Sequence, residues 1–196
     1  AAITDANNGV ITLDQLAVDG TVALTTNGSG NATVVNDAAL NLAASTVGGA
    51  LSATATTGNM TDSGNVTVAG TSSFTTSANN ATIVLNNTNA LTGAVTITTN
   101  DDSGTDADAT IDNGTTALIL AASTIDGDLT ITSGHASGIT DSGTLTVGGN
   151  LAAITDANNG VITLDQLAVD GAVALTTNGS GNATVVNDAA LNLAAS

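Results

Sequence analysis

The 196-residue sequence has no lysine, arginine, cysteine or proline, and its only aromatic residue is Phe74. Without lysine or arginine the chain lacks the contacts that proteins use on nucleic-acid phosphates and anionic membrane surfaces, so we expect no nucleic-acid partner. The absence of cysteine excludes a disulfide framework and a cysteine metal site, and leaves the redox compartment open. No apolar run reaches the length of about 18 residues that a spanning helix needs, so we expect no membrane insertion.

The acidic residues are all aspartates. They number 17, and the formal net charge is -17 at pH 7. Aspartate, together with the abundant Gly, Asn, Ser and Thr, favours turns, whereas the missing Glu and Lys favour helix. The apolar residues are almost all Ala, Val, Leu and Ile, which are small or β-branched and suit the narrow interior of stacked strands. This composition predicts an all-β protein.

One block of sequence occurs twice. Residues 1–45 reappear as residues 152–196, with Ala172 in place of Thr21 as the single change. Weaker internal units span 46–123 and 124–196. The first copy begins in mid-pattern without a signal peptide, and the second stops at the chain end. We therefore expect residues 1–196 to be a single β-solenoid segment of a longer tandem array.

A shorter pattern runs through the whole chain: an aliphatic strand, a corner glycine, and a second strand with alternating apolar residues. Val18, for example, precedes the first corner, and Val22 and Leu24 follow it. The corners are Gly20, Gly49, Gly70, Gly93, Gly127, Gly149 and Gly171. Alternation with a period of two places the apolar side chains on one side of each strand. The spacing predicts a parallel β-helix with three strands per coil and roughly 20 to 25 residues per coil.

The lack of proline and the glycines at the corners both fit this architecture. Proline is missing because every strand of a stacked coil must donate hydrogen bonds to its neighbours. A Cβ atom would hinder the backbone conformation at the corners, which explains the glycines. Parallel crossovers favour a right-handed coil.

Threonine recurs five residues after the corner glycines. The set is Thr25, Thr54, Thr75, Thr98, Thr132 and Thr176, and Ile154 is the exception. Small residues stand two positions before each, so we expect a flat outward face of methyl and hydroxyl groups. This face has three open interpretations: it binds ice or another surface, it packs against a second solenoid, or it reflects only the β propensity of threonine.

An acidic loop carries Asp101, Asp102, Asp106 and Asp108, and it is longer than its counterpart after Asn27. Alternating aspartates in a glycine-containing loop offer the several oxygen ligands that Ca²⁺ requires. The spacing differs from that of an EF-hand, and the bidentate glutamate is missing. The alternatives are a calcium site and a solvated polar loop, and weak divalent-ion binding along the acidic surface is favoured over one tight site. No other cofactor is predicted.

The signals for catalysis are weak. His135, the only histidine, stands in a Gly-His-Ala-Ser stretch typical of a turn, without an evident nucleophile or orienting partner. Asp141 and Asp156 could form the carboxylate pair of a polysaccharide-cleaving enzyme, but the chain has no Lys or Arg to hold an anionic sugar. We therefore expect a protein that is not an enzyme.

Two stretches carry a family resemblance: residues 123–132 (STIDGDLTIT) and residues 139–151 (ITDSGTLTVGGNL). They resemble the repeat regions of very large bacterial surface proteins of the filamentous haemagglutinin type, which are secreted by the two-partner route. The resemblance covers essentially the whole chain and implies a right-handed parallel β-helix that forms long, thin adhesive fibres. The secretion domain that marks the family is not in this sequence, and no functional residues carry over.

Together, the repeats and the resemblance predict a structural protein, a segment of an extracellular or cell-surface stalk, sheath or adhesin filament. The expected partners are further copies of the protein itself, joined end to end or side by side, and surface glycans or neighbouring cell surfaces. The alternative is an ice-binding or surface-binding module that uses the threonine face.

Overall fold

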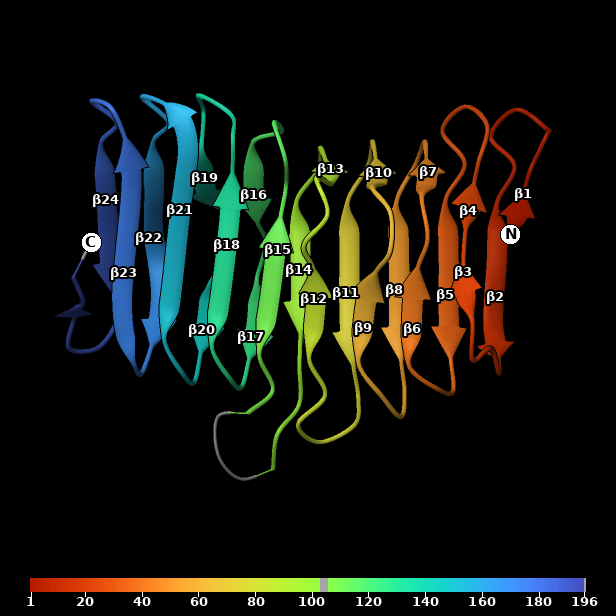
Figure 1. Ribbon diagram of the computed structural model, residues 1–196, viewed down its shortest axis with the longest axis horizontal. Coiled ribbons are helices and arrows are strands. Elements are labelled where there is room, and N and C mark those ends of the chain that lie inside the picture. The colour runs from red at the N-terminus through yellow and green to blue at the C-terminus, as the bar shows by residue number, and fades with distance from the viewer. Residues whose placement is uncertain (103–105, 196) are drawn as a thin grey trace.

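The computed structural model describes residues 1–102 and 106–195, and in these ranges every regular element is a β-strand. The strands wind into about nine coils about 21 residues apart, and strands of successive coils pair in parallel in three sheets. Figure 1 shows the coils stacked along the long axis of the molecule, with the two termini at opposite ends. The predicted all-β solenoid with parallel coils is therefore confirmed, while its handedness stays a prediction.

Each sheet collects the strands from one side of the coils. The five-stranded sheet contains β1 (Ala2–Ile3), β4 (Leu24–Thr25), β7 (Ser45–Val47), β10 (Val66–Val68) and β13 (Ala90–Leu91). The eleven-stranded sheet contains β2 (Ile11–Leu16), β5 (Ala32–Asn36), β8 (Leu51–Ala55), β11 (Ser72–Thr76), β14 (Val95–Thr98), β16 (Leu118–Leu120), β17 (Ser123–Ile125), β19 (Ile139–Asp141), β20 (Leu145–Val147), β22 (Ile162–Val169) and β24 (Ala183–Asn187). The nine-stranded sheet contains β3 (Thr21–Val22), β6 (Leu40–Leu42), β9 (Met60–Asp62), β12 (Ile83–Leu85), β15 (Ala109–Asp112), β18 (Leu129–Ser133), β21 (Leu151–Asn158), β23 (Ala172–Asn178) and β25 (Asn192–Leu193).

The cross-section of the solenoid changes along its length. The five-stranded sheet ends at β13, and the later strands β16 and β19 join the eleven-stranded sheet instead. Strand β22 then runs without a break along both β19 and β20. The C-terminal coils therefore have two long sheets where the N-terminal coils have three. In the described part of the chain there is no helix with the length and apolar character needed to cross a membrane.

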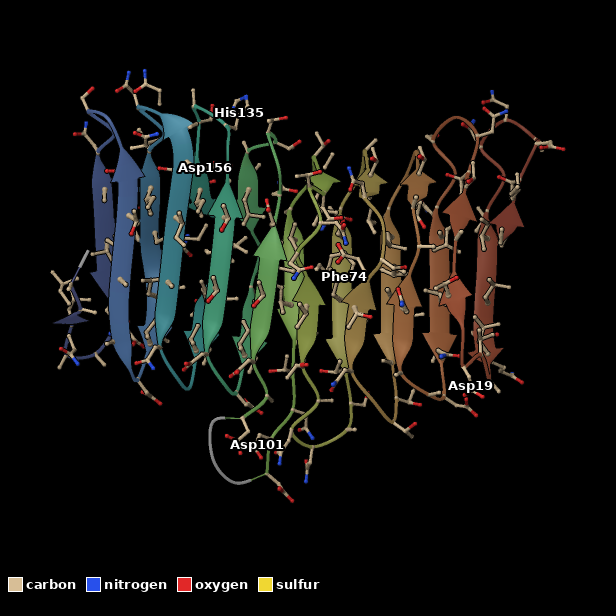
Figure 2. All side chains as sticks on the ribbon, in the orientation of Figure 1. Asp19, Phe74, Asp101, His135 and Asp156 are labelled. Atoms are coloured by element: carbon tan, nitrogen blue, oxygen red, sulfur yellow. The ribbon has the colours of Figure 1, made fainter. Side chains whose placement is uncertain are left out.

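The core consists of inward side chains that align from coil to coil. In one such ladder Val34, Ala53, Phe74 and Ile97 stand in register in consecutive strands of the eleven-stranded sheet, and all are buried. The ring of Phe74 lies in the middle of the stack, where Figure 2 labels it, and its ladder neighbour Ala53 is small. Complete burial of an aliphatic or aromatic side chain contributes about 1.5 to 3 kcal/mol. The apolar side chains that alternate along each strand therefore form one continuous apolar column inside the solenoid.

All the corner glycines except Gly20 are required by the close approach of successive coils, not by a left-handed backbone. A Cβ atom on Gly70 would lie 2.7 Å from the carbonyl carbon of Gly49, whereas ordinary van der Waals contacts begin at about 3.4 Å. The Gly70 amide donates to the Gly49 carbonyl over 2.9 Å, which holds the two corners together. Glycines with a positive φ occur elsewhere in the described residues, at Gly28, Gly114, Gly138 and Gly179.

Ser72 interrupts the apolar core. It stands between Leu51 and Val95 in an inward ladder and is 2% exposed. Its hydroxyl has no hydrogen-bond partner among the described residues. By contrast, the Ser123 hydroxyl, also buried, accepts a hydrogen bond from the Ile97 amide (3.0 Å) and donates one to the Ala121 carbonyl (2.9 Å).

We expect Ser72→Ala to raise the free energy of unfolding by about 1 kcal/mol, because it removes a buried hydroxyl that has lost its water and gained no partner. The midpoint of guanidinium unfolding measures the change. Ser123→Ala is the matched control, and it should lower the free energy of unfolding by about 1 to 2 kcal/mol. A destabilisation of similar size in both variants would show that the Ser72 hydroxyl is hydrogen-bonded in solution.

Candidate functional site

Threonines from four consecutive coils form a ladder on the outer face of the eleven-stranded sheet. Thr75 of β11 pairs with Thr54 of β8 on one side and with Thr98 of β14 on the other, and Thr98 pairs with Thr124 of β17. We call Thr54, Thr75, Thr98 and Thr124 the threonine ladder. Two positions earlier in the same strands stand Ser52, Ser73 and Thr96, which are also in register.

The threonine ladder presents hydroxyl and methyl groups to the solvent at the spacing of the coils, about 4.8 Å. Within the described ranges the side chains of Thr54, Thr75 and Thr98 have no hydrogen-bond partner, so their hydroxyls are available to a ligand or to water. A shallow hollow of about 250 Å³ lies beside the ladder and is lined in part by Ser52, Ser73 and Thr96. The arrangement is an uncharged, regularly spaced surface suited to another regular surface.

The structure does not gather all six predicted threonines on this face. Thr25 lies in β4 of the five-stranded sheet, where it pairs with Thr46. Thr132 lies in β18 of the nine-stranded sheet, and Ile154 separates it from Thr176. The predicted face is therefore divided among three sheets, because the cross-section of the coil changes and the same distance from a corner glycine leads to different sheets. Of the six predicted threonines, only Thr54, Thr75 and Thr98 lie side by side in one sheet without an interruption.

The acidic loop lies at one long edge of the molecule, where Figure 2 labels Asp101. Asp101 donates its backbone amide to the Asp126 carboxylate over 2.8 Å. Asp108 accepts a hydrogen bond from the Asp128 amide, also over 2.8 Å. Asp102 and Asp106 are exposed, and residues 103–105 of the loop lie outside the described residues. Among the described residues, those of the loop included, no three acidic or histidine side chains approach closely enough to hold a metal ion, and calcium binding stays a prediction.

The residues weighed for catalysis are engaged in turns and strands. His135 and Asp156 lie at the edge opposite Asp101 (Figure 2). The Nδ1 atom of His135 accepts a hydrogen bond from the amide of Ser137 over 3.0 Å, which closes the local turn. The Asp141 carboxylate accepts hydrogen bonds from two backbone amides of the next coil, at Asp165 and Gln166. These contacts give His135 and Asp141 structural roles.

A comparison with known protein families shows that the chain contains a known type of repeat. Residues 29–98 and 106–178 each match a family described as repeats of unknown function (DUF5649). The chain belongs to this family. The two matches correspond to two consecutive DUF5649 repeats, each built from several coils of the solenoid. A search of curated proteins found no match, and a search of solved structures found none either.

Both DUF5649 repeats contain the same carboxylate contact between coils. In the first, Asp62 at the end of β9 accepts hydrogen bonds from the consecutive amides of Asn86 (3.1 Å) and Asn87 (3.2 Å). In the second, Asp141 accepts from Asp165 (3.3 Å) and Gln166 (2.8 Å). Each aspartate stands in a Thr-Asp-Ser-Gly sequence. We call this contact the aspartate lock, because it fixes the position of one coil on the next.

Buried asparagines make a second kind of contact between coils. The Asn113 side chain, 0% exposed, accepts from the Leu91 amide (2.7 Å) and donates to the carbonyls of Leu91 (3.1 Å) and Ala117 (3.0 Å). Asn36, also buried, makes the same two-way contact with Val18, and the half-buried Asn187 makes it with Val169. The side-chain amide thus completes the backbone ladder where the main chain turns away.

Sequence reasoning missed both contacts because it treated Asn and Asp as turn-forming, metal-binding or catalytic residues and not as bridges between coils. The available signal was their recurrence at the last position of a strand, in the two ATVVN stretches and in the two Thr-Asp-Ser-Gly sequences.

We expect Asn113→Ala to lower the free energy of unfolding by about 2 to 4 kcal/mol, because it leaves the buried amide and carbonyl of Leu91 and the half-buried carbonyl of Ala117 without the Asn113 side chain as partner. Chemical unfolding followed by circular dichroism measures the loss. Asn86→Ala is the control, since Asn86 is exposed, and its effect should stay within about 0.5 kcal/mol. Equal stability of the two variants would mean that water replaces the Asn113 amide.

Proposed function

We propose that the chain is a segment of an extracellular or cell-surface β-solenoid fibre, a stalk, sheath or adhesin filament without catalytic activity. The DUF5649 repeats and the regular stacking of coils support a shaft built for length. The resemblance of residues 123–132 and 139–151 to filamentous haemagglutinin repeats supports the surface location. In this proposal the fibre binds copies of itself and contacts surface glycans or neighbouring cells, and it neither binds nucleic acid nor inserts into membranes.

The observation that carries the proposal is the stacking of equivalent residues from coil to coil. Val34, Ala53, Phe74 and Ile97 stand in register in consecutive strands of the eleven-stranded sheet, and all four are buried. In a solenoid each coil buries its apolar side chains against neighbouring coils, so stability grows as coils are added along the axis. A stack of this kind suits a long, thin shaft.

The charge pattern supports association along the axis over association side by side. The chain carries 17 aspartates and no Lys or Arg, so two shafts lying in parallel repel each other along their whole length. At the ends, backbone hydrogen bonds and apolar side chains offset this repulsion. The absence of Lys and Arg also leaves no cleavage site for trypsin-like proteases, which suits an exposed fibre.

We expect electron microscopy of the native material to show continuous thin fibres whose diffraction has an axial spacing of about 4.8 Å, the distance between parallel coils. The lengths of the fibres should not cluster at the length of one chain, and trypsin should leave the fibres intact. Discrete, unextended particles in the native material would overturn the fibre proposal.

The alternative function is an ice-binding or surface-binding module, and the threonine ladder is the observation that favours it. Thr54, Thr75 and Thr98 repeat at the coil spacing, and their hydroxyls have no hydrogen-bond partner within residues 1–102 and 106–195. A regular array of hydroxyl and methyl groups matches a regular surface such as a crystal face better than a flexible ligand.

Under this alternative the chain shapes ice crystals and lowers the freezing point below the melting point. Thr75→Lys should abolish both effects, because it places a long charged side chain in the middle of the threonine ladder. Thr67→Lys is the matched control: Thr67 is exposed but lies in β10 of the five-stranded sheet. Osmometry and ice-crystal microscopy measure the effects, and a lack of thermal hysteresis in the unsubstituted chain would remove the alternative.

A further inference from the structure

Five asparagines of the chain are followed directly by glycine, and the structure holds them in different ways. They are Asn8, Asn27, Asn113, Asn159 and Asn178. Asparagine is a chemically labile residue, and before glycine no side chain hinders attack of the next amide nitrogen on its side-chain carbonyl carbon. This attack needs an accessible asparagine side chain and a glycine amide that is not held in a hydrogen bond. The contacts of each pair therefore decide its reactivity.

Asn113 belongs to the most protected pair. Its side chain is 0% exposed and bonds through its oxygen to the Leu91 amide and through its nitrogen to the Leu91 carbonyl. The amide of Gly114 donates to the Asp112 carboxylate over 2.8 Å. Both reacting groups are thus held in place, and water has no access to the side chain.

Asn159 is exposed, but its pair is held within a turn. The Gly160 amide donates to the Ala157 carbonyl over 3.0 Å. The side-chain oxygen of Asn159 accepts from the amide and the hydroxyl of Ser180 in the next coil, both over 2.8 Å. Asn8 makes the same kind of contact in the first copy. In these pairs the glycine nitrogen and the side chain are both engaged.

Asn27 is held less firmly. Its side chain is exposed, and the side-chain nitrogen donates to the Asp5 carbonyl of the preceding coil over 3.0 Å. The amide of Gly28, which lies in a turn, donates no hydrogen bond among the described residues. The following coil is also in place, since the Gly48 amide donates to the Thr26 hydroxyl over 2.9 Å. The exposure of Asn27 is therefore a property of the turn and not of a chain end.

We propose that Asn27, together with its counterpart Asn178, is a site of spontaneous covalent modification by water. Asn178 is likewise exposed and donates its side-chain amide to the Asp156 carbonyl over 3.0 Å. The Gly28 nitrogen loses its proton and bonds to the side-chain carbonyl carbon of Asn27, and the side-chain nitrogen leaves as ammonia. Water then opens the resulting cyclic imide at either carbonyl, which gives aspartate or isoaspartate. The net reaction consumes water and releases ammonia, without oxidant or reductant.

The modification weakens a contact between two neighbouring coils. The side chain of Asn27 loses the N–H group that donates to the Asp5 carbonyl, and a carboxylate takes its place beside that oxygen. In isoaspartate the main chain also passes through the Cβ atom, which lengthens a turn whose carbonyl accepts from the Asn8 amide over 2.9 Å. Each copy of this turn is thus a point at which the solenoid ages. The inference goes beyond the proposed function and does not depend on it.

The test incubates the full chain at neutral pH and follows the five pairs by mass spectrometry. Digestion with pepsin in acid suits a chain without Lys or Arg, and peptides that include Thr21 or Ala172 distinguish Asn27 from Asn178. We expect the change from amide to acid to be at least about tenfold faster at Asn27 than at Asn113, where the reaction waits for local opening of the fold. Asn178 should react as Asn27 does.

The control is the same chain unfolded in guanidinium, which separates the effect of the fold from that of the sequence. All five pairs should then react at similar rates, because each is an asparagine before glycine in an open chain. A rate at Asn27 in the folded chain that is no faster than the rates at Asn113 and Asn159 would overturn the proposal. Both isoaspartate and aspartate should form at Asn27, and aspartate alone would contradict the imide step.

Discussion

The structure depends on the parallel backbone ladder between successive coils. Each strand offers amides and carbonyls on both edges, and only another coil can bond to them along their whole length. An inner coil such as the one containing β11 bonds to β8 on one side and β14 on the other. A coil of some 21 residues cannot bury its own apolar side chains, so its stability comes from its neighbours. Extension of the stack is consequently the favourable direction for this molecule.

A solenoid built from so few residue types needs specific contacts that fix which residues of neighbouring strands pair with each other. Ala, Val, Thr and Asn recur so often that neighbouring strands could pair in several shifted positions with similar apolar contacts. The buried asparagines, the aspartate locks and the close-packed glycine corners each tolerate only one position. Asn113, for example, bonds to both the amide and the carbonyl of Leu91. Because these contacts are directional, they choose the register that the apolar core alone leaves open.

The outer surface of the solenoid is acidic. Aspartates are spread along the length of the solenoid, and Figure 2 shows Asp19 and Asp101 at one long edge and Asp156 at the other. In the proposed fibre this charge disfavours contact between two solenoids lying side by side. The threonine ladder carries no charge, so another surface meets less electrostatic repulsion there than along the aspartates.

The sequence by itself determined the strand character, the coil length and the apolar core, because alternation and corner glycines act over a few residues. It also showed the repeat, since residues 1–45 and 152–196 are nearly identical. Other features were decided only by the tertiary structure. The same ITLDQL segment forms a strand of 6 residues in β2 and belongs to one of 8 residues in β22, because β22 has a coil on each side. The division of the six threonines among three sheets, the buried role of Asn113 and the contact of Asp141 with the next coil likewise depend on which coil lies beside which. The pattern of residues within a strand predicts which way each side chain points. The residues that the side chain contacts lie in a neighbouring coil, about 21 residues away in the sequence, so the pattern within one strand does not identify them.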